Sequence, residues 1–172
     1  LDSISDPDIS YEEKRELMRS ASQTGGYINI EITDANGNAR STDGKTIINL
    51  SEREYFKKAI KGERVVSDPV VSKDDSSIIV IFAVPLKWNG SINGILFGVR
   101  DGNALSDITD KITYGKSGKS LMINSKGITI AHSNRENVLN MDNIIEAAKT
   151  DPALADLAEA QSQMAKGKQG FA

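Results

Sequence analysis

The sequence contains no cysteine and only one histidine among its 172 residues, and these two shortages exclude several kinds of chemistry. Without cysteine there is no disulfide, no thiolate nucleophile and no thiolate metal site. The single histidine, His132, would have to serve any Ser-His-Asp triad, and no nucleophile-elbow motif accompanies it. We therefore predict that the chain is not an enzyme and has no catalytic residue, metal site or cofactor.

Basic blocks and long apolar runs are also missing. The formal net charge of -3 comes from interspersed acidic and basic residues, so we expect no nucleic-acid partner. The longest apolar run, residues 78–84 with Pro85 and Leu86 after it, is far below the roughly 20 residues of a membrane helix. The apolar content still suffices for a folded core, and we expect a soluble globular fragment that begins at Leu1 inside a longer protein.

Two short motifs resemble phosphate and calcium sites, but each lacks residues that its chemistry requires. Residues 118–120 read Gly-Lys-Ser, like the end of a P-loop, yet Thr113 stands where the first glycine is needed. Residues 34–38 resemble the start of an EF-hand loop, yet Ala39 replaces the required glycine and Lys45 the bidentate glutamate. We interpret residues 34–38 as a hairpin turn.

Start and stop signals mark the expected helices and strands. Ser10 with Glu13, and Ser51 with Glu54, have the spacing of capping boxes that begin helices. The expected helices begin at Tyr11, Ser51, Ala104, Asp142 and Pro152 and end near Gly25, Gly62, Ile112, Lys149 and Gly167. The expected strands cover residues 27–32, 39–42, 64–67, 78–84, 92–99, 120–123 and 128–132.

The order of these elements repeats one plan. A helix, a hairpin, a second helix, three strands and a helix are followed by another hairpin and further helices. This order predicts an α+β fold, with an antiparallel sheet flanked by helices, in tandem lobes. A Gly-rich joint at residues 115–118 separates a lobe over 1–112 from a lobe over 113–172. The second lobe is incomplete, because three closing strands are missing and its sheet edge would be open, so we expect the rest in the parent protein.

Three segments occur in an order and spacing that are specific to one family. They begin with SEREYFKKAIKGERVVSDPVVSK at residues 51–73, continue with IIVIFAVPLKWNGSINGILFGVRDGNALSDIT at 78–109 and end with YGKSGKSLMINSKGITIAHSNRENVLN at 114–140. Together they resemble the double Cache (PAS-like) extracellular sensor domain of bacterial methyl-accepting chemotaxis proteins. The resemblance covers residues 25–170.

The resemblance implies an extracytoplasmic ligand-binding region of a cell-membrane receptor. Residues 1–112 would be the membrane-distal ligand-binding lobe without its long leading helix, and residues 113–172 a partial membrane-proximal lobe. The parent would be anchored by flanking membrane helices, would form a homodimer through flanking helices and would signal across the membrane. A histidine kinase or a diguanylate cyclase could carry the same lobes. A secreted hydrolase using His132 and a purely structural spacer are alternatives of other classes.

Arg53 is the principal candidate for ligand binding. It follows the expected cap Ser51 by two positions, where the helix dipole disfavours a cation by about 0.3–1 kcal/mol. A bound carboxylate would explain this placement, and so would solvation or pairing with a neighbouring glutamate. The resemblance implies that an Arg-x-Trp-Tyr grouping contacts the ligand, and it stands here as Arg53, Tyr55 and Phe56. Phe56 equally suits packing in the core.

Two departures from the family pattern concern the ligand's amino group. Val70 replaces a tyrosine, and Val99 replaces the aspartate that contacts the amino group. Asp101 would lie on the same face as Val99 if the strand continues. Asp68 and Arg100 are weaker candidates for lining the same site. We predict that a small, anionic organic ligand, such as an amino acid or another carboxylate, binds in the distal lobe.

Overall fold

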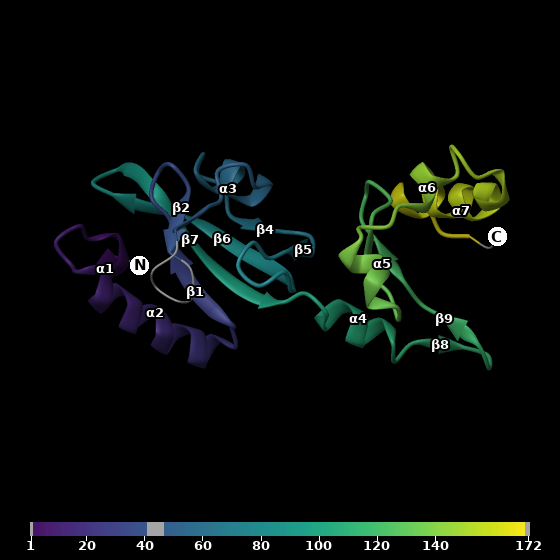
Figure 1. Ribbon diagram of the computed structural model, residues 1–172, viewed down its shortest axis with the longest axis horizontal. Coiled ribbons are helices and arrows are strands. Elements are labelled where there is room, and N and C mark those ends of the chain that lie inside the picture. Colours follow the sequence, from purple (N-terminus) through teal and green to yellow (C-terminus); the bar gives the residue numbers. More distant parts are fainter. Residues whose placement is uncertain (1, 41–46, 171–172) are drawn as a thin grey trace. The chain divides into compact units, whose positions relative to one another are not determined.

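The computed structural model describes residues 2–40 and 47–170, which form two compact units (Figure 1). Unit 1 is Leu1–Asp101 and unit 2 is Gly102–Ala172. The helices are α1 (Asp2–Ser5), α2 (Tyr11–Gly25), α3 (Glu54–Ala59), α4 (Ala104–Thr109), α5 (Arg135–Leu139), α6 (Ile144–Ala147), the 3-10 helix η1 (Pro152–Leu154) and α7 (Ala155–Ala165). The strands are β1 (Asn29–Ile32), β2 (Asn38–Arg40), β3 (Ile47–Asn49), β4 (Val65–Val66), β5 (Val70–Val71), β6 (Ile78–Trp88), β7 (Ser91–Asp101), β8 (Thr113–Tyr114), β9 (Gly118–Lys119), β10 (Met122–Ile123) and β11 (Thr129–Ala131).

Unit 1 is built on an antiparallel sheet in the order β1-β7-β6-β4, with β5 also paired to β6. Its centre is the hairpin of β6 and β7, each 11 residues long. The predicted turn at Asn89 and Gly90 is confirmed, and both residues have positive φ (48° and 79°), as the tight hairpin turns between twisted strands require.

The predicted hairpin of residues 27–32 and 39–42 is wrong in its pairing. β1 pairs with β7, whereas β2 pairs with β3, and a single bridge between Thr33 and Ala39 links the two halves. The turn itself forms, because the Asp34 carboxylate accepts hydrogen bonds from the backbone N–H groups of Asn36 and Asn38 (both 2.9 Å). The long strand β7 offers β1 a longer ladder than β2 could. Residues 41 and 42 of the predicted strand lie outside the described residues.

The two capping boxes have different outcomes. The one that begins α2 is confirmed: the Glu13 N–H donates to Ser10 Oγ (3.3 Å), and the Ser10 N–H donates to the Glu13 carboxylate (3.0 Å). The one predicted at Ser51 is wrong. The Ser51 hydroxyl donates to Asn49 Oδ1 instead (2.5 Å), and α3 begins at Glu54 with Arg53 at its N-cap.

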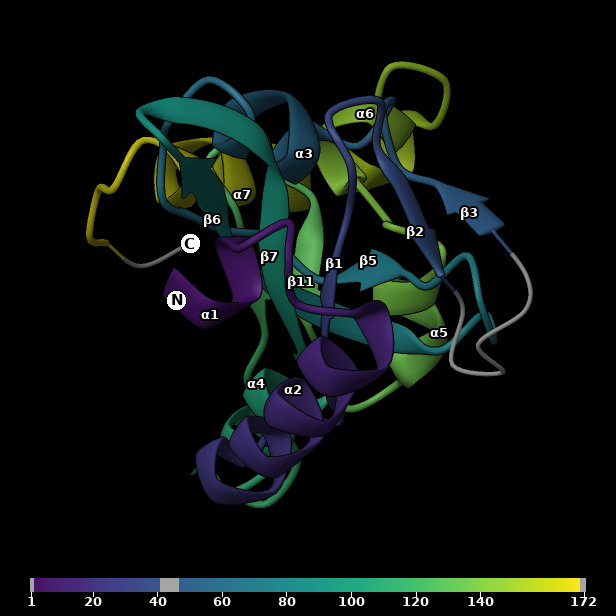
Figure 2. The ribbon, with the colours of Figure 1, turned by 90° about the vertical axis from the view of Figure 1, so that its left-hand side faces the viewer.

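The core of unit 1 lies between α3 and one face of the sheet. Tyr55, Phe56 and Ala59 of α3 are buried, and they belong to one cluster with apolar residues of β6 and β7 such as Ile81 and Phe97. Helix α2 packs near β1 on the other side of the sheet (Figures 1 and 2). On that side the ring of Tyr27 lies against Gly98 and meets Phe82 edge-on. The face of the sheet that packs against α3 also bounds a cavity, which is described below.

Unit 2 contains the predicted second hairpin, β10 and β11, around a turn in which Asn124 Oδ1 accepts hydrogen bonds from the N–H groups of Lys126 and Ile128. The predicted cap at Asp151 is also confirmed, since its carboxylate accepts from the Ala153 N–H (3.0 Å). The helix predicted from Asp142 is shorter, because Asn143 is the cap of α6. Helix α5 was not predicted.

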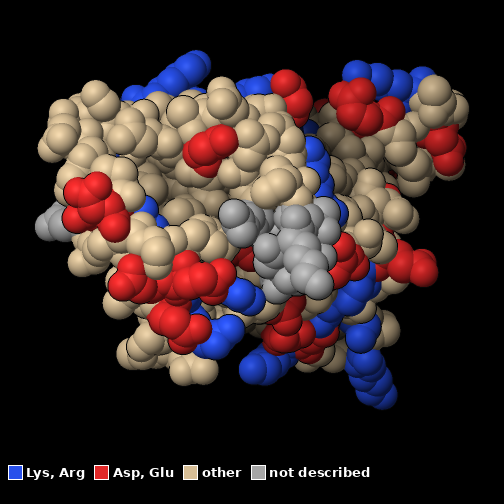
Figure 3. Space-filling view, turned by 60° about the vertical axis from the view of Figure 1, so that its left-hand side comes forward, with Lys and Arg blue, Asp and Glu red and all other residues tan. Residues whose placement is uncertain are grey.

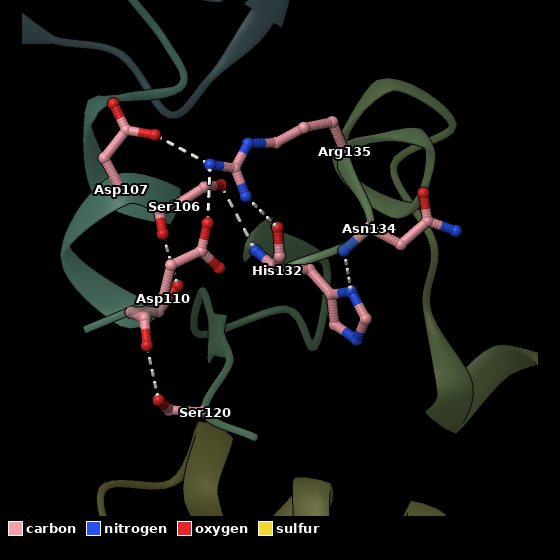
Figure 4. A network of polar contacts seen from close by, with 8 residues as sticks. Ser106, Asp107, Asp110, Ser120, His132, Asn134 and Arg135 are labelled. Carbon is pink, nitrogen blue, oxygen red and sulfur yellow. Dashed lines mark hydrogen bonds and ion pairs between the residues drawn. The ribbon is translucent and has the colours of Figure 1, made fainter. Parts of the chain in front are cut away.

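The division between the units falls earlier than the joint at residues 115–118, because α4 packs within unit 2. Ser106 of α4 accepts a hydrogen bond from the His132 N–H (3.2 Å), and Arg135 bonds to Asp107 and Asp110 of the same helix (Figure 4). The assignment of a distal and a proximal receptor lobe stays a prediction. Within residues 2–40 and 47–170, no helix is both long and apolar enough to cross a membrane.

Candidate functional site

A cavity of about 150 Å³ lies in unit 1, between the α3 face of the sheet and the segment that contains β5. Strand register explains its floor: Asn29 of β1, Val99 of β7 and Ile81 of β6 are opposite one another and share one face, and all three line the cavity. A cavity of roughly this size accommodates one benzene molecule in an engineered protein. The space therefore suits a small solute.

Two cationic residues, Arg53 and Lys73, line the cavity. Arg53 is half-buried, and its Nη2 donates to the Val71 carbonyl (2.8 Å), which fixes the guanidinium beside β5. A guanidinium has five N–H donors, so this bond leaves donor capacity for an anion. Lys73 also lines the cavity, and its ammonium donates to the Asn49 carbonyl (2.8 Å). Both cations are thus held in place by backbone carbonyls.

Strand β1 contributes an amide and an acidic side chain to the cavity lining. Asn29 Nδ2 donates to Glu31 Oε1 (2.9 Å), and both residues line the cavity. Burial, with a smaller contribution from Asp74, raises the pKa of Glu31 to about 7. Within the described residues, Asn29 Oδ1 is buried without a hydrogen-bond donor. The β1 side of the cavity therefore contains the Glu31 carboxylate, with the amide of Asn29 bonded to it.

Tyr55 interacts electrostatically with both Arg53 and Glu31. Burial raises the pKa of its hydroxyl to about 12, while Arg53 lowers it and Glu31 raises it by a smaller amount. The ring is buried and packs at a tilt against Phe97, with 6.4 Å between the ring centroids. The hydroxyl stays protonated at neutral pH and can donate a hydrogen bond.

The structure brings together four of the eight residues predicted for the site, namely Arg53, Tyr55, Val70 and Val99, all in the cavity lining. Phe56 is buried in the core beside them and is not among the lining residues. Asp68 is exposed and also lies outside the lining. The contact of any of these residues with a ligand stays a prediction.

Two further candidates lie at the end of β7. The strand does continue to Asp101, which is on the side of Val99, but Asp101 is exposed and not in the cavity lining. Arg100 points to the other face, where its guanidinium donates to the Gly25 carbonyl (2.7 Å) and lies 4.6 Å from the ring centroid of Tyr27. Packing against α2 and the aromatic rings accounts for Arg100.

Sequence reasoning missed Asn29, Glu31 and Lys73. The alternation Ile28-Asn29-Ile30-Glu31-Ile32 is a signal that could have found the first two, because it places both polar side chains on one face of a strand. Which face would bound a cavity depends on the pairing of β1 with β7, and the sequence pattern indicated a different partner.

The only histidine takes part in a structural cluster of unit 2. His132 Nδ1 accepts a hydrogen bond from the Asn134 N–H (2.9 Å), and the His132 carbonyl accepts from Arg135 (2.7 Å) (Figure 4). The Ser106 hydroxyl bonds to the backbone of His132 and not to its ring. A hydrolase would need a serine hydroxyl on one ring nitrogen and a carboxylate on the other. The described contacts of His132 therefore do not support the hydrolase alternative.

The surface shown in Figure 3 carries acidic and basic side chains side by side among uncharged residues. This mixture agrees with the interspersed charges of the sequence. Such a face creates no strong field of one sign.

Comparison with family models decides the family, because the model of the Cache domain matches residues 1–170. The chain belongs to the Cache domain family. The mixed helices and antiparallel sheet confirm the predicted fold class for this Cache domain. A comparison with curated proteins gives no match.

Solved structures of chemoreceptor ligand-binding domains share the fold of this Cache domain. The domain of Tlp3 from Campylobacter jejuni, in complex with 4-methylisoleucine, is 13% identical, with a TM-score of 0.60 over 79% of this chain and 56% of that one. The domain of CtaA from Pseudomonas fluorescens, in complex with L-serine, is 17% identical, with a TM-score of 0.64 over 87% of this chain and 66% of that one. The domain of PctC from Pseudomonas aeruginosa PAO1, in complex with GABA, is 16% identical, with a TM-score of 0.64 over 84% of this chain and 66% of that one. The chain thus spans less than two thirds of these domains.

Proposed function

We propose that this Cache domain is the extracytoplasmic sensing region of a bacterial transmembrane chemoreceptor and that the unit 1 cavity binds a small organic ligand bearing a carboxylate. The observation that carries the proposal is the half-buried Arg53 guanidinium in a cavity with apolar walls. A pocket that combines apolar walls with a few fixed polar groups is the usual form of a small-molecule site. The domain senses the ligand and catalyses no reaction.

The bound molecules of the structural neighbours support this ligand class. The domains of Tlp3, CtaA and PctC were crystallised with 4-methylisoleucine, L-serine and GABA, each of which carries a carboxylate. In our proposal Arg53 pairs with that carboxylate, Tyr55 donates a hydrogen bond to the ligand, and Val70 and Val99 contact its apolar part. Phe56 supports Tyr55 from the core.

The position in the parent protein is part of the proposal. Unit 1 would be the membrane-distal lobe and unit 2 the beginning of the membrane-proximal lobe of a homodimeric receptor. A ligand can shift the receptor only by as much as it prefers one conformation over another. The output would be chemotaxis signalling, with a histidine kinase or a diguanylate cyclase as the alternative that the same lobes permit.

Calorimetry tests the proposal on the chain as it stands. The wild type is titrated with individual amino acids and organic acids, and Arg53→Ala is titrated with each compound that binds. We expect Arg53→Ala to lose at least about tenfold in affinity, because hydrogen bonds to a charged group contribute roughly 1.5–3 kcal/mol. Arg64→Ala, at an exposed residue outside the cavity lining, is the matched control.

Two outcomes would contradict the proposal. Unchanged affinity of Arg53→Ala would remove the role of the guanidinium. If no compound releases heat or raises the melting temperature of the wild type, the structural-spacer alternative is favoured, because a ligand that binds the native state must stabilise it.

A further inference from the structure

The β1 side of the cavity carries an acidic side chain, Glu31, beside the amide of Asn29. Among the described residues, no lysine or arginine forms an ion pair with Glu31, and Asn29 Oδ1 has no donor. Buried charges in native proteins are almost always paired, so a half-buried carboxylate that lines a cavity without a cation favours a cationic partner from the solute. The Glu31 carboxylate can accept N–H donors from that solute, and Asn29 holds it in place through the bond from Nδ2 to Oε1 (2.9 Å).

We propose that Asn29 and Glu31 on β1 form a subsite for a protonated nitrogen of the ligand. This inference deepens the proposed function, because it adds a cationic end to a ligand whose carboxylate lies at Arg53. It also relocates the amino contact, since the resemblance implied an aspartate at position 99, where this chain has Val99. Asn29 is directly opposite Val99 in the strand register and Glu31 is opposite Phe97, and all four residues line the cavity, so the subsite lies on the strand next to that position.

The charged groups around Glu31 come from several elements. Tyr55 of α3 interacts electrostatically with Glu31, and Asp74, in the turn before β6, disfavours the ionised carboxylate. Arg53, at the N-cap of α3, lines the same cavity. Lys73 and Asp75 also line the cavity, with the Lys73 ammonium held by the Asn49 carbonyl and the Asp75 carboxylate by Ser77.

Helix α2 brings two more cations near Glu31. Asn29 and Glu31 also line a second hollow, against α2, that contains Arg15 and Arg19. Those arginines pair with Glu12 (3.7 Å) and Glu16 (3.2 Å) on their own helix. Neither arginine forms an ion pair with Glu31.

The subsite makes ligand binding depend on pH in a definite direction. The unliganded Glu31 has a pKa of about 7, and a bound ammonium group favours its ionised form. Below that pH the ligand must displace a proton, so the affinity for an amino compound falls by up to about tenfold for each pH unit. A ligand without a cationic nitrogen would show no such loss.

The test compares pairs of compounds that differ by one amino group. L-alanine is titrated against propionate, L-norvaline against pentanoate, and γ-aminobutyrate against butyrate, at about pH 8 and about pH 6. For the wild type we expect the amino member of a pair to bind at least about tenfold more tightly at the higher pH, as charge-assisted hydrogen bonds imply. Glu31→Gln should abolish this preference and keep the dependence on Arg53, whereas the exposed control Glu63→Gln should change neither.

The outcomes separate this inference from the proposed function. If the carboxylates bind through Arg53 but the amino group gives no advantage, or if Glu31→Gln keeps the preference, the subsite is refuted and the proposed function stands. If no member of any pair binds, the subsite is refuted, and the wider titration with amino acids and organic acids decides the proposed function. Should Glu31→Gln fail to fold, the pH dependence of the wild type decides alone: an affinity for amino compounds that does not fall between about pH 8 and 6 overturns the inference.

Discussion

The two units of the chain arrange their polar groups differently. In unit 2 the charged side chains pair with one another: Arg135 bonds to Asp107, Asp110 and the His132 carbonyl. In unit 1 the cavity leaves Glu31 without an ion-pair partner among the described residues and holds Arg53 by a backbone carbonyl. Unit 2 also has a buried oxygen without a donor, Gln161 Oε1, but neither hollow of unit 1 reaches it. A buried polar atom without a partner therefore does not by itself indicate a ligand site, and in unit 1 the second observation is that Glu31 and Arg53 line one cavity.

The largest expected effect concerns the core beneath the cavity. Ile95 of β7 is fully buried in the unit 1 cluster. Ile95→Ala should lower the free energy of unfolding by about 2–5 kcal/mol, because it removes buried apolar atoms and leaves a void. Urea unfolding measures the change, with Ile112→Ala at an exposed position of unit 2 as the control, which should change stability by less than about 0.5 kcal/mol. Equal effects of the two variants would contradict the assignment of the core to unit 1.

The next effect follows from the unpaired carboxylate. The pKa of Glu31 is raised from 4.5 to about 7 in the folded protein, so its contribution to stability is fully present below about pH 4.5 and is lost as the pH rises through 7. The wild type should thus lose up to about 3 kcal/mol relative to Glu31→Gln between these limits. Urea unfolding at a series of pH values measures this difference. Parallel curves for the two proteins would show that Glu31 is solvated like an ordinary surface carboxylate.

A smaller effect is expected where β1 runs into its turn beside β7. A Cβ added at Gly94 would lie 1.9 Å from the Thr33 carbonyl oxygen. Gly94→Ala must therefore push the end of β1 away from β7, at about 1–3 kcal/mol, and should weaken any ligand contact that depends on β1. Thermal unfolding and calorimetry measure the two effects. Gly170→Ala, where a Cβ meets no atom within 4 Å, should leave both unchanged.

The smallest effect belongs to the charge cluster of unit 2. Arg135→Met should reduce stability only slightly, since the ion pairs with Asp107 and Asp110 are partly exposed. Ligand binding in unit 1 should be unaffected. Lys149→Met, which breaks an exposed pair with Glu146, should cost less, about 0.3 kcal/mol. A loss of ligand affinity in Arg135→Met would contradict a purely structural role for the cluster.

Local signals in the sequence predicted the fold well where a cap or turn depends only on residues close to it in the chain. The cap at Ser10 and the turn at Asn89 and Gly90 depend on neighbouring residues alone, and both are confirmed. The pairing of β1 with β7 depends on residues far apart in the chain, and the hairpin signal at 34–38 indicated the nearer partner. The second cap was wrong because Asn49 competes for the Ser51 hydroxyl.

The site was also predicted only in part, because some of its residues are recognised from a local motif and others only from the strand pairing. Arg53 and Tyr55 were found through a motif on one short segment, and both line the cavity. Asn29 and Glu31 were missed because their face became known only with the strand pairing. Arg100 was placed near Val99 in sequence, but neighbouring residues in a strand point to opposite faces, and the guanidinium bonds to Gly25.

The most direct test of the central claim is an amide chemical-shift titration of the whole chain. L-alanine, L-norvaline and γ-aminobutyrate are added in turn to the labelled protein. The account predicts saturable shifts at Glu31, Arg53 and Val99 around the cavity, with the Arg135 cluster of unit 2 unchanged. Shifts confined to unit 2, or no saturable shift with any of the three compounds, would contradict a ligand site in unit 1.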